Sequence, residues 1–155
     1  MKKYLHIIAI AILMQLPQLI QAQQASRVAQ FNIQNKIALQ GYDAVAYFTQ
    51  TKAIKGKNEF AVVAEGITYY FSSIQNKELF KKDVKKYEPQ FGGWCAYAMG
   101  ATAEKVDIDP ETFKIVNGKL YLFYHSWVNN TLPKWNKDET SLKLKAETSW
   151  MHFFK

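Results

Sequence analysis

The sequence predicts an α+β fold, in which a small antiparallel sheet built from two hairpins packs against several short helices and a C-terminal helix. Two hairpin patterns and one helical stripe support this prediction. Residues 60–63 and 67–71 are rich in β-branched and aromatic residues and flank a tight turn at Gly66. Residues 113–116 and 119–124 flank Asn117-Gly118, the residue pair favoured in a type I′ turn. The apolar stripe of the final helix consists of Leu142, Ala146, Trp150 and Phe153.

Hydroxyl or acidic residues precede the helices that we expect in the first half of the chain. Asp43 precedes residues 44–48, Ser72 or Ser73 precedes residues 74–82, and Asp83 precedes a further short turn. Such side chains accept hydrogen bonds from the free N–H groups at a helix start. A strand is the alternative for residues 44–48, because valine, tyrosine and phenylalanine also suit a sheet.

Two more short helices are expected in the second half. Residues 92–99 are predicted to form a helix with Cys95 in its first turn and Gly100 as a left-handed C-cap. Ser126 is expected to cap a helix over residues 127–132. Apart from the two hairpins, the sequence shows no internal repeat.

The amino terminus is typical of a secretory signal peptide over residues 1–22. Lys2 and Lys3 form a basic start, residues 4–19 are mostly apolar, and Ala22 is a small residue suited to cleavage. We therefore expect a secreted or periplasmic protein with no membrane span after cleavage; an uncleaved anchor is the alternative. The polar residues 23–35 are interpreted as a flexible arm, and residues 36–155 as a single domain.

Charge and cysteine content narrow the possible chemistry. Loss of Lys2 and Lys3 lowers the formal net charge from +7 to +5, and Arg27 is the only arginine, which argues against a nucleic-acid partner. A chain with one cysteine forms no internal disulfide. The absence of a CxxC motif argues against dithiol redox activity.

Four motifs occur in an order that is familiar from a known family. They are residues 41–48 (GYDAVAYF), 66–73 (GITYYFSS), 87–98 (YEPQFGGWCAYA) and 116–122 (VNGKLYL). Together they resemble the secreted branch of the YHS-domain proteins, over about Lys36 to Trp150. The resemblance implies a small α+β domain with a compact antiparallel sheet and packed helices. Suspected metal-binding YHS domains carry cysteines at the positions of Ala46 and Ser72, so this chain lacks those soft ligands.

Three functional classes are consistent with these observations. The preferred one is a non-catalytic module that binds a small ligand or metal ion in an aromatic-lined site, for which the candidate residues are Tyr42, Asp43, Tyr47, Trp94, Cys95 and Tyr97. The second is copper or zinc handling, with Cys95 and His125 as ligands. The third is a thiol-dependent enzyme that uses Cys95. Structural roles compete with each: packing for Cys95, helix capping for Asp43, and a capping or surface position for His125.

Overall fold

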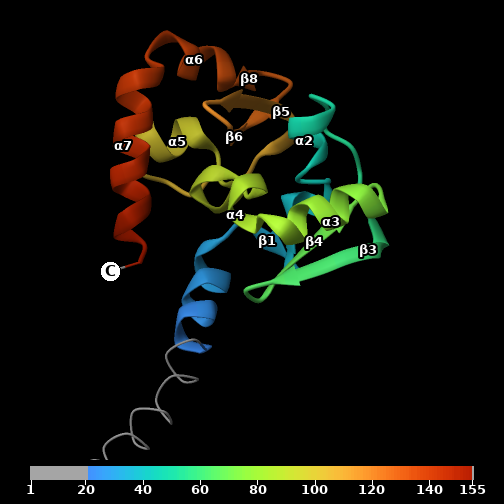
Figure 1. Cartoon of the computed structure of the whole chain (residues 1–155). Coiled ribbons are helices and arrows are strands. Elements are labelled where there is room, and N and C mark those ends of the chain that lie inside the picture. The colour runs from blue at the N-terminus through green and yellow to red at the C-terminus, as the bar shows by residue number, and fades with distance from the viewer. Residues whose placement is uncertain (1–20, 155) are drawn as a thin grey trace, which may run out of the picture.

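A computed structural model of the chain describes residues 21–154 and shows an α+β domain (Figure 1), which confirms the predicted fold class. The helices are residues 21–30, α2 (Ala46–Thr49), α3 (Ile74–Lys82), α4 (Val84–Tyr87), α5 (Ala96–Ala101), α6 (Leu132–Lys137) and α7 (Glu139–His152), with 3₁₀ turns η1 (Leu39–Gly41) and η2 (Gln90–Gly93). The strands are β1 (Ile33–Gln34), β2 (Ile37–Ala38), β3 (Lys57–Ala64), β4 (Ile67–Phe71), β5 (Asp109–Val116), β6 (Lys119–Phe123), β7 (His125–Ser126) and β8 (Asn129–Asn130).

Both predicted hairpins are present, but they belong to different sheets. Hairpin β3–β4 lies in a four-stranded sheet of order β1-β2-β4-β3, in which β2 pairs with β4 in parallel. Hairpin β5–β6 forms a sheet of its own. The prediction of a single sheet built from both hairpins was therefore wrong, because the free edge of β4 is paired with β2 rather than with the second hairpin.

The two halves of the domain repeat the same backbone path. Strands β3 and β4 recur as β5 and β6 with identical lengths, 52 residues later in the chain, so that Gly66 corresponds to Gly118. The pairing recurs as well: Val63↔Thr68 becomes Ile115↔Leu120, and both hairpins contain an irregularity after their first pair. Figure 1 shows the first-half elements β3, β4 and α3 together on one side, and β5, β6, α5 and α6 on another.

Backbone torsions and long-range pairs follow the same 52-residue shift. Leu39, Gln40 and Gly41 have φ values of 55°, 51° and 81°, and Phe91, Gly92 and Gly93 have values of 54°, 59° and 86°. The parallel pair Ile37↔Thr68 recurs as Pro89↔Leu120. The hydrogen bond from the Asp43 N–H to the Ile54 carbonyl (2.8 Å) recurs between Cys95 and Val106 (2.9 Å). The sequence conceals this repeat, because side chains at equivalent positions mostly differ.

The core consists of two clusters of buried aromatic and aliphatic side chains. One surrounds the first hairpin and includes Tyr69, Phe71 and Phe80, with Phe71 and Phe80 ring centroids 4.9 Å apart. The other joins the second hairpin to α5, α6 and α7 around the fully buried Trp135. On α7, Leu142 and Ala146 are buried as predicted, while Trp150 and the C-cap residue Phe153 are partly buried.

The segment 23–35 differs from the flexible arm that the sequence suggested. Residues 21–30 are helical, Phe31 is buried, and the Asn32 N–H donates to the Gly92 carbonyl over 2.9 Å. Arg27 pairs with both Glu65 and Glu88. Long-range contacts with residues 88–93 order this polar segment, so the packed part of the chain begins before Lys36. The predicted signal peptide falls almost entirely outside the described residues.

Three local predictions in the second half were wrong. Cys95 is the N-cap of α5 rather than a member of its first turn. Gly100 lies inside α5, where a β-carbon would come within 2.3 Å of the Leu142 carbonyl oxygen on α7, so close helix packing rather than a left-handed cap requires glycine. Residues 127–132 do not form the helix expected after Ser126; β7 and β8 form a small hairpin there, and helix begins only at Leu132.

Candidate functional site

Asp43 is a buried hydrogen-bond acceptor at the centre of the first half. Its Oδ1 accepts from the N–H groups of Val45 (2.8 Å) and Ala46 (3.2 Å), so Asp43 caps the turn that leads into α2, whose own N-cap position is Val45. Its Oδ2 accepts from the Ser72 N–H (2.7 Å), the Ser72 hydroxyl (2.6 Å) and the Asn76 side-chain amide (2.7 Å). One carboxylate thus connects α2, the end of β4 and α3, and all of these hydrogen bonds are to groups within the domain.

Cys95 occupies the equivalent position in the second half. Its side chain is fully buried, and its Sγ lies 3.3 Å from the Tyr124 N–H and 3.4 Å from the Thr131 hydroxyl. The Tyr124 N–H corresponds to the Ser72 N–H that donates to Asp43. The Cys95 thiol therefore contacts the end of β6 and the residue before α6, much as the Asp43 carboxylate contacts the end of β4 and α3. This contact assigns Cys95 a structural role.

The four aromatic candidates face different surroundings. Tyr47 is fully buried, and its hydroxyl donates to the Pro110 carbonyl over 2.9 Å; burial raises the pKa of this phenol well above its usual value. Trp94 donates from Nε1 to the Gln30 carbonyl over 2.7 Å. The Lys55 ammonium lies 4.1 Å from the ring centroid of Tyr42, and the Lys134 ammonium lies 6.0 Å from the ring centroid of Tyr97.

Several of these candidates pack in the core or against it. Tyr47 and Cys95 belong to the same buried cluster, with Tyr42 and Tyr97 packed at its margin. None of the six predicted ligand-binding residues lines any of four prominent hollows in residues 21–154. The proposed ligand contacts of these residues stay a prediction.

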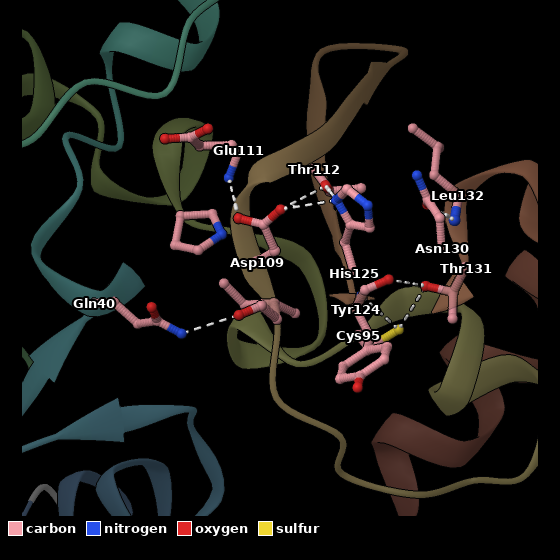
Figure 2. Close-up of polar contacts among 12 residues, drawn as sticks. Gln40, Cys95, Asp109, Glu111, Thr112, Tyr124, His125, Asn130, Thr131 and Leu132 are labelled. Atoms are coloured by element: carbon pink, nitrogen blue, oxygen red, sulfur yellow. Dashed lines mark hydrogen bonds and ion pairs between the residues drawn. The ribbon is translucent and has the colours of Figure 1, made fainter. Parts of the chain in front are cut away.

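His125 lies in a separate polar network on the surface. Its Nδ1 is 3.2 Å from Asp109 Oδ2 and 3.1 Å from the Thr112 hydroxyl, whereas Figure 2 shows the Cys95 sulfur facing Thr131 and Tyr124. Burial alone would raise the pKa of Asp109, but hydrogen bonds from the Glu111 N–H, Thr112 and His125 together lower it.

The residues proposed as metal ligands do not fit that role. The Cys95 thiol is buried and accepts a backbone N–H, while His125 directs Nδ1 to Asp109. Within residues 21–154, no group of three histidine, cysteine, aspartate or glutamate side chains is placed to hold a metal ion. We therefore derive no metal chemistry from this pair.

A hollow of about 490 Å³ lies where the segment 88–92 meets the amino-terminal segment and α7. Its apolar walls include Phe31, Pro89, Trp150 and Met151. The Glu88 carboxylate beside them is bound by Arg27 and by the Tyr69 hydroxyl (2.8 Å). Lys85 and Lys119 also line the hollow, and in the described part of the chain no hydrogen bond or ion pair engages their ammonium groups. Glu147 supplies one further carboxylate.

The glycine pair of the 87–98 motif shapes this hollow. Gly92 has a φ of +59°, and a β-carbon there would lie 2.7 Å from Trp150 Cη2 and 3.1 Å from the Phe31 Cα. Glycine therefore permits the close approach of the amino-terminal segment and α7. Phe91 also adopts a left-handed conformation, with a φ of 54°, which is unusual for a bulky residue. The motif that the sequence singled out thus positions neighbouring side chains.

Sequence reasoning missed most residues of this hollow. Phe31 falls in the segment interpreted as an arm, Trp150 in the predicted helical stripe and Lys119 in the second predicted hairpin, whereas Lys85 was not among the candidates. The only local signal was the Pro89–Gly92 segment itself, because the other walls come from positions far apart in the chain.

Comparisons of the chain with protein-family models, with curated proteins and with solved structures found no match. The resemblance to YHS domains therefore remains a prediction that rests on the four sequence motifs. Within residues 21–154, no helix combines the length and apolar character needed to cross a bilayer.

Proposed function

We propose that this protein is a non-catalytic binding module, a secreted or periplasmic YHS-type domain that holds a small amphipathic anion in the hollow beside residues 88–92. The observation that carries the proposal is the pairing of an aromatic wall with two unengaged lysines in one concavity. Ligand sites typically combine apolar walls with a few polar groups that orient the ligand.

The charge distribution supports an anionic ligand. Arg27 and Glu88 neutralise one another, so the remaining charges are Lys85, Lys119 and Glu147. Both lysines are exposed at the rim, where an ammonium group attracts an anion without the cost of burying a charge. Trp150 and Phe31 pack edge to face, with ring centroids 5.8 Å apart, and offer an apolar surface beside that rim.

The buried thiol supports a module without catalysis. A nucleophilic cysteine must reach its substrate as a thiolate, whereas the Cys95 side chain has no exposed surface and lies between Tyr124 and Thr131. No hydrogen bond in residues 21–154 joins Cys95 to His125 or to a carboxylate. The general base that a thiol enzyme requires is therefore not beside it.

Titration with the fluorescent probe 8-anilinonaphthalene-1-sulfonate tests the proposal, because this probe combines an aromatic body with one negative charge. We expect saturable binding to the native protein. The double variant Lys85→Glu/Lys119→Glu should weaken it about tenfold or more, because reversing two charges replaces attraction by repulsion. Lys145→Glu on α7 is the matched control, since Lys145 is exposed and does not line the hollow.

Circular dichroism should first show that all variants keep the native fold, because the probe also binds partly unfolded chains. Non-saturable binding, or equal affinities in the double variant and the Lys145 control, would show that the hollow is not a ligand site.

A further inference from the structure

The hairpin β7–β8 carries the most exposed apolar side chains among the large hydrophobic residues of the described chain. Trp127 and Val128 form its two-residue tip, and each is 92% exposed. Trp135, in contrast, is fully buried, and Trp94 and Trp150 are partly buried. Exposing a tryptophan and a valine at one point leaves a substantial apolar area in water.

The internal repeat shows that the fold is complete without this hairpin. In the first half, only Ser72 and Ser73 separate β4 from α3. In the second half, Tyr124 and Thr131 take these two places, and the segment His125–Asn130 lies between them. The Ser73 carbonyl accepts the Lys77 N–H (3.1 Å), and the Thr131 carbonyl accepts the Trp135 N–H (2.9 Å) in the same way. The hairpin is thus an insertion into the β6–α6 connection, which otherwise matches the β4–α3 connection.

The residues at the tip do not suit the turn itself. Two-residue hairpin loops favour asparagine and glycine, as at Asn117-Gly118 in this chain. Trp127 and Val128 instead suit a half-buried surface. Neither turn geometry nor core packing explains their presence, so contact with something outside the domain is the remaining explanation.

The extent of the exposed apolar surface favours a bilayer over a protein partner. A stable protein interface buries about 800 Å² on each side. The other exposed large apolar residues lie on different elements, such as Val63 on β3 and Met151 on α7, and do not extend the tip into a patch of that size. A lipid surface requires only that a few side chains enter it, and tryptophan favours the membrane interface.

The charges near the tip favour an anionic surface. Residues 125–137 include Lys134 and Lys137 and no aspartate or glutamate; of the two carboxylates that follow, Asp138 and Glu139, the second is paired with Lys114. The Lys134 ammonium donates to the Asn129 side chain over 2.8 Å, which places this cation on the stem of the hairpin. In the described residues, an ion pair joins the hairpin to one carboxylate, that of Asp109, through His125.

We propose that hairpin β7–β8 attaches the domain to an anionic lipid bilayer, with Trp127 and Val128 in the interface and with Lys134 and Lys137 at the headgroups. Attachment through two apolar side chains is weak and reversible. It falls as the salt concentration rises, because the lysine contribution is screened. The ligand hollow lies on other elements, so this inference does not depend on the proposed function.

Quenching of tryptophan fluorescence by lipids with brominated acyl chains tests the proposal on the full chain. Residues 4–19 are themselves apolar, so the readout must be the quenching that depends on Trp127 rather than vesicle association alone. We expect vesicles of phosphatidylglycerol and phosphatidylcholine to quench the wild-type protein, and Trp127→Ala to remove most of that quenching. Val63→Ala, which alters a 69% exposed residue on β3, is the control and should behave as the wild type.

Lys134→Gln/Lys137→Gln should raise the lipid concentration needed for half-maximal quenching about 25-fold, because each lysine near an anionic surface adds about a fivefold attraction. The proposal fails if Trp127→Ala is quenched as strongly as the wild type. It also fails if pure phosphatidylcholine quenches Trp127 equally well. Protection of Trp127 by a co-purifying protein in the absence of lipid would likewise overturn it.

Discussion

Replacing Gly92 by alanine measures how strongly the junction between the amino-terminal segment, residues 88–93 and α7 holds the domain together. The new β-carbon would meet Trp150 Cη2 at 2.7 Å and the Phe31 Cα at 3.1 Å. Overpacking of this kind costs about 1–3 kcal/mol. The left-handed φ of +59° adds about 1–2 kcal/mol for any residue with a β-carbon. We expect Gly92→Ala to lower the free energy of unfolding by about 2–5 kcal/mol.

Gly118→Ala separates these two effects. Gly118 has a similar φ of +69°, but a β-carbon there would have no neighbour within 4 Å. Its substitution should cost only the backbone contribution of about 1–2 kcal/mol. Urea unfolding, followed by circular dichroism, gives both values.

Trp150→Phe provides a further check, because phenylalanine lacks the Cη2 atom that meets the new β-carbon. The cost of Gly92→Ala should be smaller in the Trp150→Phe background. Equal losses in Gly92→Ala and Gly118→Ala would refute the argument that the glycine pair permits close packing.

Three further predictions concern buried and paired groups. Asp43→Ala should lower the free energy of unfolding by about 3–5 kcal/mol, because it leaves several buried donors without an acceptor, and Asp43→Asn should cost less; equal losses would argue against this hydrogen-bond role. Native Cys95 should react with iodoacetamide only as fast as the protein unfolds, so that the rate rises with urea; rapid labelling of the native state would contradict its burial. The pKa of Asp109 is lowered in the folded state, so its contribution to stability is present above the unfolded pKa of about 4 and is lost as the pH falls through the folded value. The stability difference between the wild type and Asp109→Asn, measured by urea unfolding, should therefore shrink in acid, and a difference independent of pH would contradict the assignment.

Features determined by neighbouring residues could be predicted from the sequence. The two hairpins follow from β-rich runs around short polar turns, and the turn at Asn117-Gly118 has the left-handed torsions expected of that pair, with φ values of 51° and 69°. Asp43 caps the turn that leads into α2 and Asp83 caps α4, because a cap needs only a side chain and the N–H groups two or three residues later. Ser73, rather than Ser72, accepts the N–H of the next helix; Ser72 instead donates to Asp43.

Features determined by contacts between distant segments could not be predicted. The polar segment 23–35 is ordered by Arg27 and Asn32, whose partners Glu88 and Gly93 lie 61 residues away, and by Phe31, which packs against Trp150. The hollow also forms between segments that are far apart in the chain, from Arg27 to Met151. The predicted ligand-binding residues are a related case: Tyr47 and Cys95 lie in the core, and the sequence alone does not distinguish aromatic residues that line a pocket from those that fill a core.

The different acceptors at Asp43 and Cys95 also bear on how the chain folds. Because the two halves have the same backbone path, a hairpin could pack against the wrong half during folding, as happens when repeat proteins misassemble. An exchange of the first hairpin together with α3 would present Ser72 and Asn76 to a weakly accepting thiol. It would also leave the Asp43 carboxylate facing fewer donors in a buried site, which is costly. The divergence of these two side chains therefore makes the two equivalent positions chemically distinct, so that each hairpin finds its matching acceptor only in its own half.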